Sequence, residues 1–350
     1  MLRTYPTTGA ILIAALALLA STGSSEPAAQ LVSGTHHLAA TPATVTIGYF
    51  DAKVSPVLRV KSGDTVELET LVSSGLKRLE DAGVPPDQIQ PVLREIDREV
   101  KKDPHWGAHL LTGPIFVGGA APGDVLEVRL KSIEMAVPYA VNTIQPGAGT
   151  LPDEFPYARF KVTQLDLTRK VAKFSEGVEI PARPFFGVLG VAPPAVTGRI
   201  SSHPPWVHGG NMDNKELVAG TTLYLPVYVP GALFSVGDGH AGQGDGEVCT
   251  SALETSLKGT IQLVVRKHMK LGWPRAETPT AYITMGFSED LEEAAKIALR
   301  EMLDFLVSEK HLSRDYAYIL ASDAVDFKIT QLVDGRKGVH AVLPKAIFVH

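Results

Sequence analysis

TTLYLPVYVPGALFSVG, residues 221–237, is the stretch that decides the fold class. Apolar side chains occupy every second position from Leu223 to Val229, and a period of two is typical of a β-strand with one buried face. Similar short segments, bounded by Gly and Pro turns, recur at 44–50, 57–64 and 65–70. Helical spacing is rare, so we expect a mainly β domain, sandwich- or barrel-like, with two intertwined halves.

Polar side chains gather at both ends of this stretch. Carboxylates, imidazoles and an amide lie there among glycines, which let a backbone approach a ligand closely. A strand that joins the two groups would bring both to its ends, and such a set could hold one divalent ion. We therefore interpret 208–254 as the functional site, against the simpler alternative of Gly/Asp turns between strands. Its polar residues are His208, Asn211, Asp213, Asp238, His240, Asp245, Glu247 and Glu254.

Several motifs of this region resemble one enzyme family. HGGNMDNKEL at 208–217, GDGH at 237–240, GDGEV at 244–248 and HLLTGPIFVGGAAPGDVLEVRL at 109–130 are similar to acetamidase/formamidase sequences. YAYILASDAVDFKITQLVDG and VHAVLPKAIF are similar to the closing segment of that family, so the resemblance runs from about residue 45 to the C-terminus. It implies hydrolysis of small linear amides, such as formamide or acetamide, to ammonia and a carboxylate.

Amide hydrolysis needs a nucleophile, stabilisation of the developing oxyanion and a proton for the leaving amine. The chain lacks the Gly-x-Ser-x-Gly motif of serine hydrolases. Cys249, the only cysteine, lies among carboxylates and apolar residues, the opposite of the cationic setting that activates a thiol. A divalent metal ion that polarises the amide carbonyl fits best.

This metal mechanism assigns roles to the polar residues. Glu247 is the expected base, and Asn211 is expected to hydrogen-bond the amide or orient a ligand. The resemblance places His109 near the active site, where it would complete the metal or amide-binding shell. Zinc is our first expectation, whereas the many oxygen donors leave calcium open. The expected metal ligands are His208, Asp213, Asp238 and His240.

A non-catalytic alternative uses the same residues. Asp/Gly loops could hold a structural calcium in a secreted β-rich protein that recognises a sugar or a peptide. Calcium sites rarely recruit imidazole, so His208 and His240 favour the enzyme.

The N-terminus predicts export. Arg3 precedes an apolar run from Ala10 to Ala20 that is too short for a membrane helix, and small residues follow it. We expect a secretory signal peptide at 1–29, an amidohydrolase domain at 30–350, and a secreted or periplasmic protein without a membrane segment in its mature form.

The composition narrows the range of partners. A formal charge of −5 over 350 residues suggests neither nucleic acid nor an anionic membrane. One cysteine excludes a disulfide within the chain. The expected partner is a small amide, and the family resemblance suggests a homo-oligomer.

Three other segments have sequence patterns that differ from the alternating strands. Apolar residues at helical spacing predict a helical hairpin at 71–102, with Asp87 as the cap of its second helix. A longer helix is expected from Ser288 to about Lys310. The Pro- and Gly-rich stretch 137–199 is expected to be irregular. Within it, the family resemblance implies a buried strand at FFGVLGVAP that leads to the site.

Overall fold

The computed structural model describes residues 34–103 and 105–349, so the expected signal peptide lies outside the described residues. Strands dominate, as the sequence predicts. The helices are α1 (Leu76–Asp81), α2 (Pro91–Glu99), α3 (Leu291–Lys310) and α4 (Arg314–Ala324), with short 3-10 turns η1 (Ala195–Thr197) and η2 (Lys345–Ile347). The strands are β1 (Thr35–Leu38), β2 (Val45–Ile47), β3 (Tyr49–Phe50), β4 (Leu58–Lys61), β5 (Thr65–Thr70), β6 (Leu110–Gly118), β7 (Val125–Met135), β8 (Tyr139–Ile144), β9 (Arg159–Asp166), β10 (Val171–Ser175), β11 (Val178–Pro181), β12 (Phe185–Gly190), β13 (Ile200–Ser201), β14 (Gly209–Asn211), β15 (Thr222–Pro226), β16 (Phe234–His240), β17 (Leu257–Arg266), β18 (Arg275–Glu277), β19 (Ala281–Ser288), β20 (Asp326–Gln331) and β21 (Lys337–Pro344).

Two sheets pack face to face around the main core. One has nine strands in the order β1-β5-β17-β7-β15-β18-β19-β21-β20, and the other has the order β14-β12-β16-β6-β2, with β4 added beside β6. Alternate residues of both sheets point inward and form a single apolar cluster. It includes Leu126 and Leu223 from the first sheet and Phe186 and Val236 from the second. The sandwich prediction is confirmed.

The two halves of the chain interleave within each sheet. In the larger sheet β17, from the second half, lies between β5 and β7, and β15 follows on the far side of β7. In the smaller sheet β16 lies between β12 and β6. Where strands of opposite halves are neighbours, residues far apart in sequence meet, and His109 of the first half approaches Asp238 of the second in this way.

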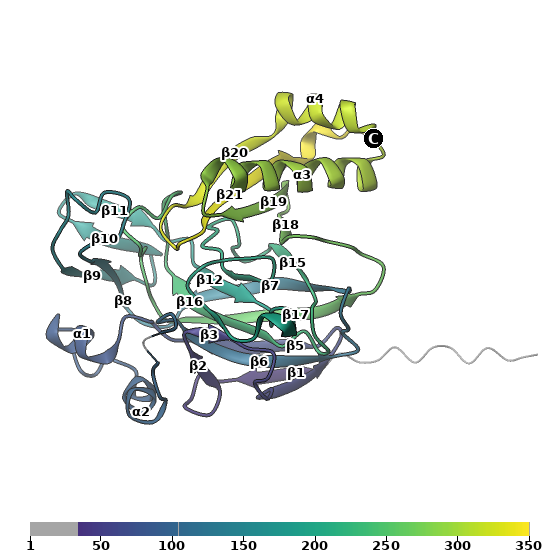
Figure 1. Ribbon diagram of the computed structural model, residues 1–350. Coiled ribbons are helices and arrows are strands. Elements are labelled where there is room, and N and C mark those ends of the chain that lie inside the picture. Colours follow the sequence, from purple (N-terminus) through teal and green to yellow (C-terminus); the bar gives the residue numbers. More distant parts are fainter. Residues whose placement is uncertain (1–33, 104, 350) are drawn as a thin grey trace, which may run out of the picture. The chain divides into compact units, whose positions relative to one another are not determined.

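The C-terminal helices cover one end of the larger sheet, and Figure 1 shows α3 and α4 beside β19 to β21. Ala294, Ala298 and Met302 pack from α3 against this end of the sheet. The helix begins later than expected, because Asp290 rather than Ser288 accepts the hydrogen bond from the N–H of Glu293. No helix among the described residues is long and apolar enough to cross a membrane.

The stretch 137–199 is more regular than the sequence suggested. β8, β9, β10 and β11 form a separate four-stranded antiparallel sheet there (Figure 1). The expectation of irregular chain was wrong, because the frequent prolines and glycines lie in the connections while the strands between them keep a ladder. The strand expected at FFGVLGVAP is present as the fully buried β12.

The two helices of the 71–102 segment are short and pack beside this sheet. Leu79, Leu93 and Ile96 lie in one apolar cluster with Tyr139 and Val141 of β8. The second helix begins after Gln90, with Pro91 in its first position, so Asp87 is not its cap. These contacts are those of helices packed on the body of the fold.

Candidate metal and active site

His240 is the centre of the candidate site. Its Nε2 atom lies 3.2 Å from Asp238 Oδ2, 3.2 Å from Glu254 Oε2 and 3.9 Å from Asp213 Oδ1. All four side chains are buried. Two sets of potential metal ligands share this imidazole, and within each set the ligand atoms lie within 4.8 Å of one another. The sets are Asp213, His240 and Glu247, and Asp238, His240 and Glu254.

The strand ladder brings these residues together. Asp238 and His240 are the third-last and last residues of β16. His240 pairs with Phe185 of β12 on one side and forms an isolated bridge with Glu254 on the other. The Phe185 ring meets the imidazole edge to face, with 4.9 Å between ring centroids. The imidazole is therefore fixed by its own strand and by both neighbouring segments.

Three of the carboxylates stand on strained backbone. Asp213, Asp238 and Glu247 have φ of 49°, 54° and 41°, in the left-handed region that non-glycine residues seldom adopt. Such conformations cost about 1–3 kcal/mol each and persist where the surrounding structure holds them, often at functional sites. Their concentration around one imidazole agrees with a functional role.

Gly187 on β12 makes this close approach possible. A Cβ atom at this position would lie 2.4 Å from Asp213 Oδ1 and 2.8 Å from Asp238 Oδ2. The Gly187 carbonyl also accepts hydrogen bonds from the N–H groups of Met212 and Asp213. Any larger residue would push the two carboxylates apart.

Gln243 fixes the orientation of the His240 ring. Its side-chain amide donates to the Asp213 carbonyl over 2.7 Å, so its Oε1 faces His240 Nδ1 at 2.9 Å as an acceptor. Nδ1 therefore carries a proton, and Nε2 faces the carboxylates. This is the arrangement of a metal-binding histidine whose second nitrogen is held by a neighbouring group.

The pKa values of the residues in this cluster shift in different directions. Burial disfavours the charged imidazole, but the Glu254 and Asp238 carboxylates outweigh it and hold the pKa of His240 well above its usual value. Burial would raise the pKa of Asp238, yet His109 and His240 outweigh it and lower the pKa. Burial raises the pKa of Glu254. Without a metal ion, the proton on the His240 imidazole offsets the negative charge of the surrounding carboxylates. A bound cation would offset the same charge.

A second group of buried carboxyl side chains, Glu247 and Asp334, lies next to Asp213. Burial and the neighbouring Asp213 and Asp334 hold the pKa of Glu247 well above its usual range. Burial and Asp213 raise the pKa of Asp334 in the same way. Neither oxygen of Asp213 has a hydrogen-bond partner in the structure. Such a set of buried oxygens needs protons or a cation to be stable.

His109 reaches the site from the start of β6. Its Nε2 lies 3.9 Å from Asp238 Oδ2, and its Nδ1 lies 2.8 Å from the Ser202 hydroxyl. The His203 ring stacks on it with 6.2 Å between centroids, and His203 Nε2 lies 3.8 Å from Asp334 Oδ1. His109 and His203 thus border the carboxylates on one side.

His208 stands apart from these groups. It belongs to neither ligand set found in the described residues, and its ring packs edge to face on Phe50, with 4.8 Å between centroids. Burial and the positive charge of Arg336 lower the pKa of His208 to about 3. The expected grouping of His208 with Asp213 around one ion stays a prediction, and Gly209 and Gly210, both at positive φ, turn the chain between the two residues.

Asn211 keeps an unused acceptor. Its side chain is buried and its Oδ1 atom has no hydrogen-bond partner in the structure. Together with the unpartnered oxygens of Asp213, it fits a site built to receive a ligand.

The sequence assigns no role to three members of this site, Gln243, Glu254 and Asp334. The Asp334 turn reaches the site because Gly246 exchanges backbone hydrogen bonds with Thr330 and Leu332. The side-chain oxygen of Gln331 holds this turn, because it accepts hydrogen bonds from the N–H groups of Val333 and Asp334. The repetition of Asp-Gly at 245–246 and 334–335 was the available signal.

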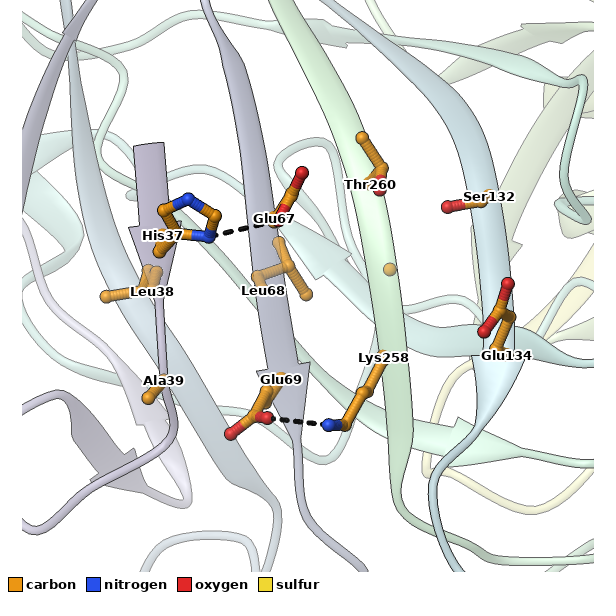
Figure 2. A pocket seen from close by; sticks show the side chains of 11 residues that line it. His37, Leu38, Ala39, Glu67, Leu68, Glu69, Ser132, Glu134, Lys258 and Thr260 are labelled. Carbon is orange, nitrogen blue, oxygen red and sulfur yellow. Dashed lines mark ion pairs between the residues drawn. The ribbon is translucent and has the colours of Figure 1, made fainter. Parts of the chain in front are cut away.

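A different hollow lies on the face of the larger sheet turned away from the core. Figure 2 shows that its charged side chains point at one another across β1, β5 and β17. His37 Nδ1 lies 3.0 Å from Glu67 Oε2, and Lys258 Nζ lies 3.3 Å from Glu69 Oε1. These pairs are largely exposed, so this hollow of about 310 Å³ lacks the buried, unpartnered groups of the His240 cluster.

Comparison with known proteins gives a consistent result. The model of the Acetamidase/Formamidase family matches residues 48–197 and 197–350. An acetamidase structure from Bacillus halodurans is 31% identical, covers 89% of this chain and 98% of that one, and superposes with a TM-score of 0.75. An acetamidase structure from Yersinia enterocolitica is 29% identical, covers 92% and 95%, and has a TM-score of 0.78.

Two curated relatives match a smaller part of the chain than these structures do. A formamidase from Methylophilus methylotrophus is 28% identical over 215 residues, which are 47% of this chain and 51% of that protein. An acetamidase from Mycolicibacterium smegmatis is 27% identical over 40% of this chain and 49% of that protein. The chain spans about half the length of these two relatives.

Proposed function

The chain belongs to the acetamidase/formamidase family, and we propose on this basis that it hydrolyses the carbon–nitrogen bond of small linear amides. The products are a carboxylate and ammonia, and formamide and acetamide are the first substrates to test. The observation that supports this most directly is the buried imidazole–carboxylate cluster around His240. It supplies both a cation site and carboxyl groups that can move protons.

We propose that the site holds a divalent cation, with zinc as the first candidate. The ligands would be His240, Asp213 and Asp238, with Glu254 in reach of the same imidazole nitrogen. The unpartnered oxygens of Asp213 and the fixed ring of His240 support this assignment. When bound, such a cation polarises an amide carbonyl and makes a nearby water more acidic. We leave His208 out of this ligand set, because among the described residues it joins neither group of candidate ligands.

Glu247 would move the proton of the reaction. Hydrolysis adds water to the carbonyl carbon and breaks the bond to nitrogen, so one proton of the water must reach the leaving amine. Burial and the neighbouring Asp213 and Asp334 raise the pKa of Glu247, and a carboxyl with a raised pKa holds a transferred proton better than one of ordinary pKa. Asn211 would accept an N–H of the amide at its free Oδ1, and His109 would border the substrate.

We also propose that the protein is exported. The support is the N-terminal sequence alone: a basic residue, a short apolar run and small residues. Mass spectrometry of the mature protein tests this, because an intact Met1 would contradict it.

The activity is tested by ammonia release from formamide and acetamide. The wild type should release ammonia with metal present in the purified sample, and Asp238→Asn should lose the activity. Asp304→Asn removes an exposed carboxylate, paired with Arg314, and should behave as the wild type. A wild type that releases ammonia from no linear amide, or an active Asp238→Asn variant, would refute the proposed function.

A further inference from the structure

An apolar pocket lies beside the four-stranded sheet, outside the carboxylate cluster. Its volume is about 550 Å³, within the range typical of small-molecule sites. The walls come from Ile144, Leu151, Phe155, Phe174 and Val248. Four of these side chains remain exposed, among them Leu151 at 52% and Val248 at 59%. Apolar side chains that line a concave surface and stay open to solvent indicate a binding site.

Two cations form the polar part of this pocket. Arg159 and Lys161 line it, and the Lys161 ammonium lies over the Phe174 ring, 4.5 Å from its centroid. The remaining lining is mostly apolar or backbone, so a ligand would be held chiefly by burial of carbon rather than by hydrogen bonds.

The pocket leads toward the candidate active site. A neighbouring hollow of about 400 Å³ shares Asn142, Phe174, Val248 and Cys249 with it. The lining of that second hollow continues to Gln243, which holds the His240 ring, and to Glu247. The two hollows are therefore adjacent through these four shared residues, and Glu247 lines the second of them.

Hydrogen bonds fix the pocket to the segment that carries Glu247. The Val248 carbonyl accepts the N–H of Thr150, and the Ser251 hydroxyl accepts the N–H of Thr143. The Asn142 amide donates to the Ser251 carbonyl over 3.2 Å. One loop thus positions both the proton-moving carboxyl and the apolar wall.

We propose that this pocket binds the acyl chain of the substrate, so that the enzyme prefers amides with an apolar chain of several carbons over acetamide. This inference rests on the proposed amide hydrolysis. Formamide and acetamide are too small to reach from Glu247 into the pocket. Each methylene buried there should raise kcat/KM about fourfold, the factor that corresponds to its transfer from water.

The test compares ammonia release from acetamide, butanamide and hexanamide. In the wild type, kcat/KM should rise along this series by at least tenfold from acetamide to hexanamide. Ala148→Trp fills the pocket and Leu151→Asp places a carboxylate on its wall. Both variants should lower the hexanamide-to-acetamide ratio of kcat/KM by about tenfold, mainly through KM for hexanamide. Ala158→Trp, in the same connection but outside the pocket lining, should keep the wild-type ratio.

The outcomes separate this inference from the proposed function. Acetamide hydrolysis without a preference for longer chains, or pocket variants with an unchanged ratio, would overturn the acyl pocket alone. If the pocket variants instead change the oligomeric state in solution while the ratio stays constant, the pocket covers a second copy of the chain and the proposal fails. Absence of ammonia from every amide would overturn both.

Discussion

His240 and His208 are a natural pair for comparison, because both are fully buried and both meet a phenylalanine edge to face. Their surroundings differ in charge. Three carboxylates lie within 4 Å of His240 Nε2, and two of them, Glu254 and Asp238, outweigh burial and raise the pKa of His240. In the described part of the chain His208 has no hydrogen-bond partner for either ring nitrogen, and burial lowers its pKa to about 3. Burial and aromatic packing are common to both histidines, so the convergence of carboxylates is what distinguishes His240 from His208.

The largest effect is expected from replacing each histidine with leucine, which is similar in size. His240→Leu removes the shared nitrogen of both ligand sets, so metal content and amide hydrolysis should fall to background. His208→Leu should retain metal and most of the activity. Metal analysis and ammonia release on the two folded variants test this, and equal losses would remove the distinction between the two sites.

Glu247 should separate proton transfer from metal binding. Glu247→Gln keeps the size of the side chain and removes its titrating proton, so turnover should fall by ~10²–10³-fold while the metal stays bound. Asp245→Asn, two residues earlier on the exposed side of the same loop, loses only an ion pair with Lys215 and should stay near wild type. If Glu247→Gln loses its metal instead, Glu247 is a ligand rather than the proton-moving group.

Gln243 should have a smaller effect, because it acts through His240. Gln243→Leu removes the acceptor that holds the ring, and metal affinity should fall about 10–100-fold, as for other residues that orient a ligand. Excess metal should restore most of the activity. Titration of the metal-free variant measures the affinity, and an unchanged dissociation constant would show that the ring is held by packing alone.

The last effect concerns not the activity but the stability of the fold in acid, which depends on His208. Its folded pKa of about 3 lies below the ordinary value of 6.5, so the unfolded chain binds more protons between these values and stability falls as pH falls through this window. At pH 4 the loss is on the order of 2–3 kcal/mol. His208→Leu should flatten the unfolding free energy between pH 6.5 and pH 4 relative to the wild type. Identical pH slopes in denaturant titrations would contradict the neutral, isolated state of this histidine.

The sequence predicted the fold class because alternation survives in most strands, and it placed Asp238 and His240 correctly at the end of a strand. Two kinds of information were missing. His208 lies close to Asp213 in sequence, yet the positive φ of Gly209 and Gly210 redirects the chain, which no spacing rule reveals. Asp334 and Glu254 enter the site through pairing with segments far away in sequence. The interleaved strand order that produces these contacts is a property of the whole sandwich.

We propose that the His240 cluster needs a divalent cation to hydrolyse amides, and reconstitution with metal tests this most directly. The wild type is stripped with a chelator, then titrated with zinc and, separately, calcium while ammonia release from acetamide is followed. We predict that the stripped enzyme is inactive and regains full activity at one equivalent of zinc per chain, whereas stripped His240→Leu does not recover. Full activity in the metal-free wild type would contradict the account.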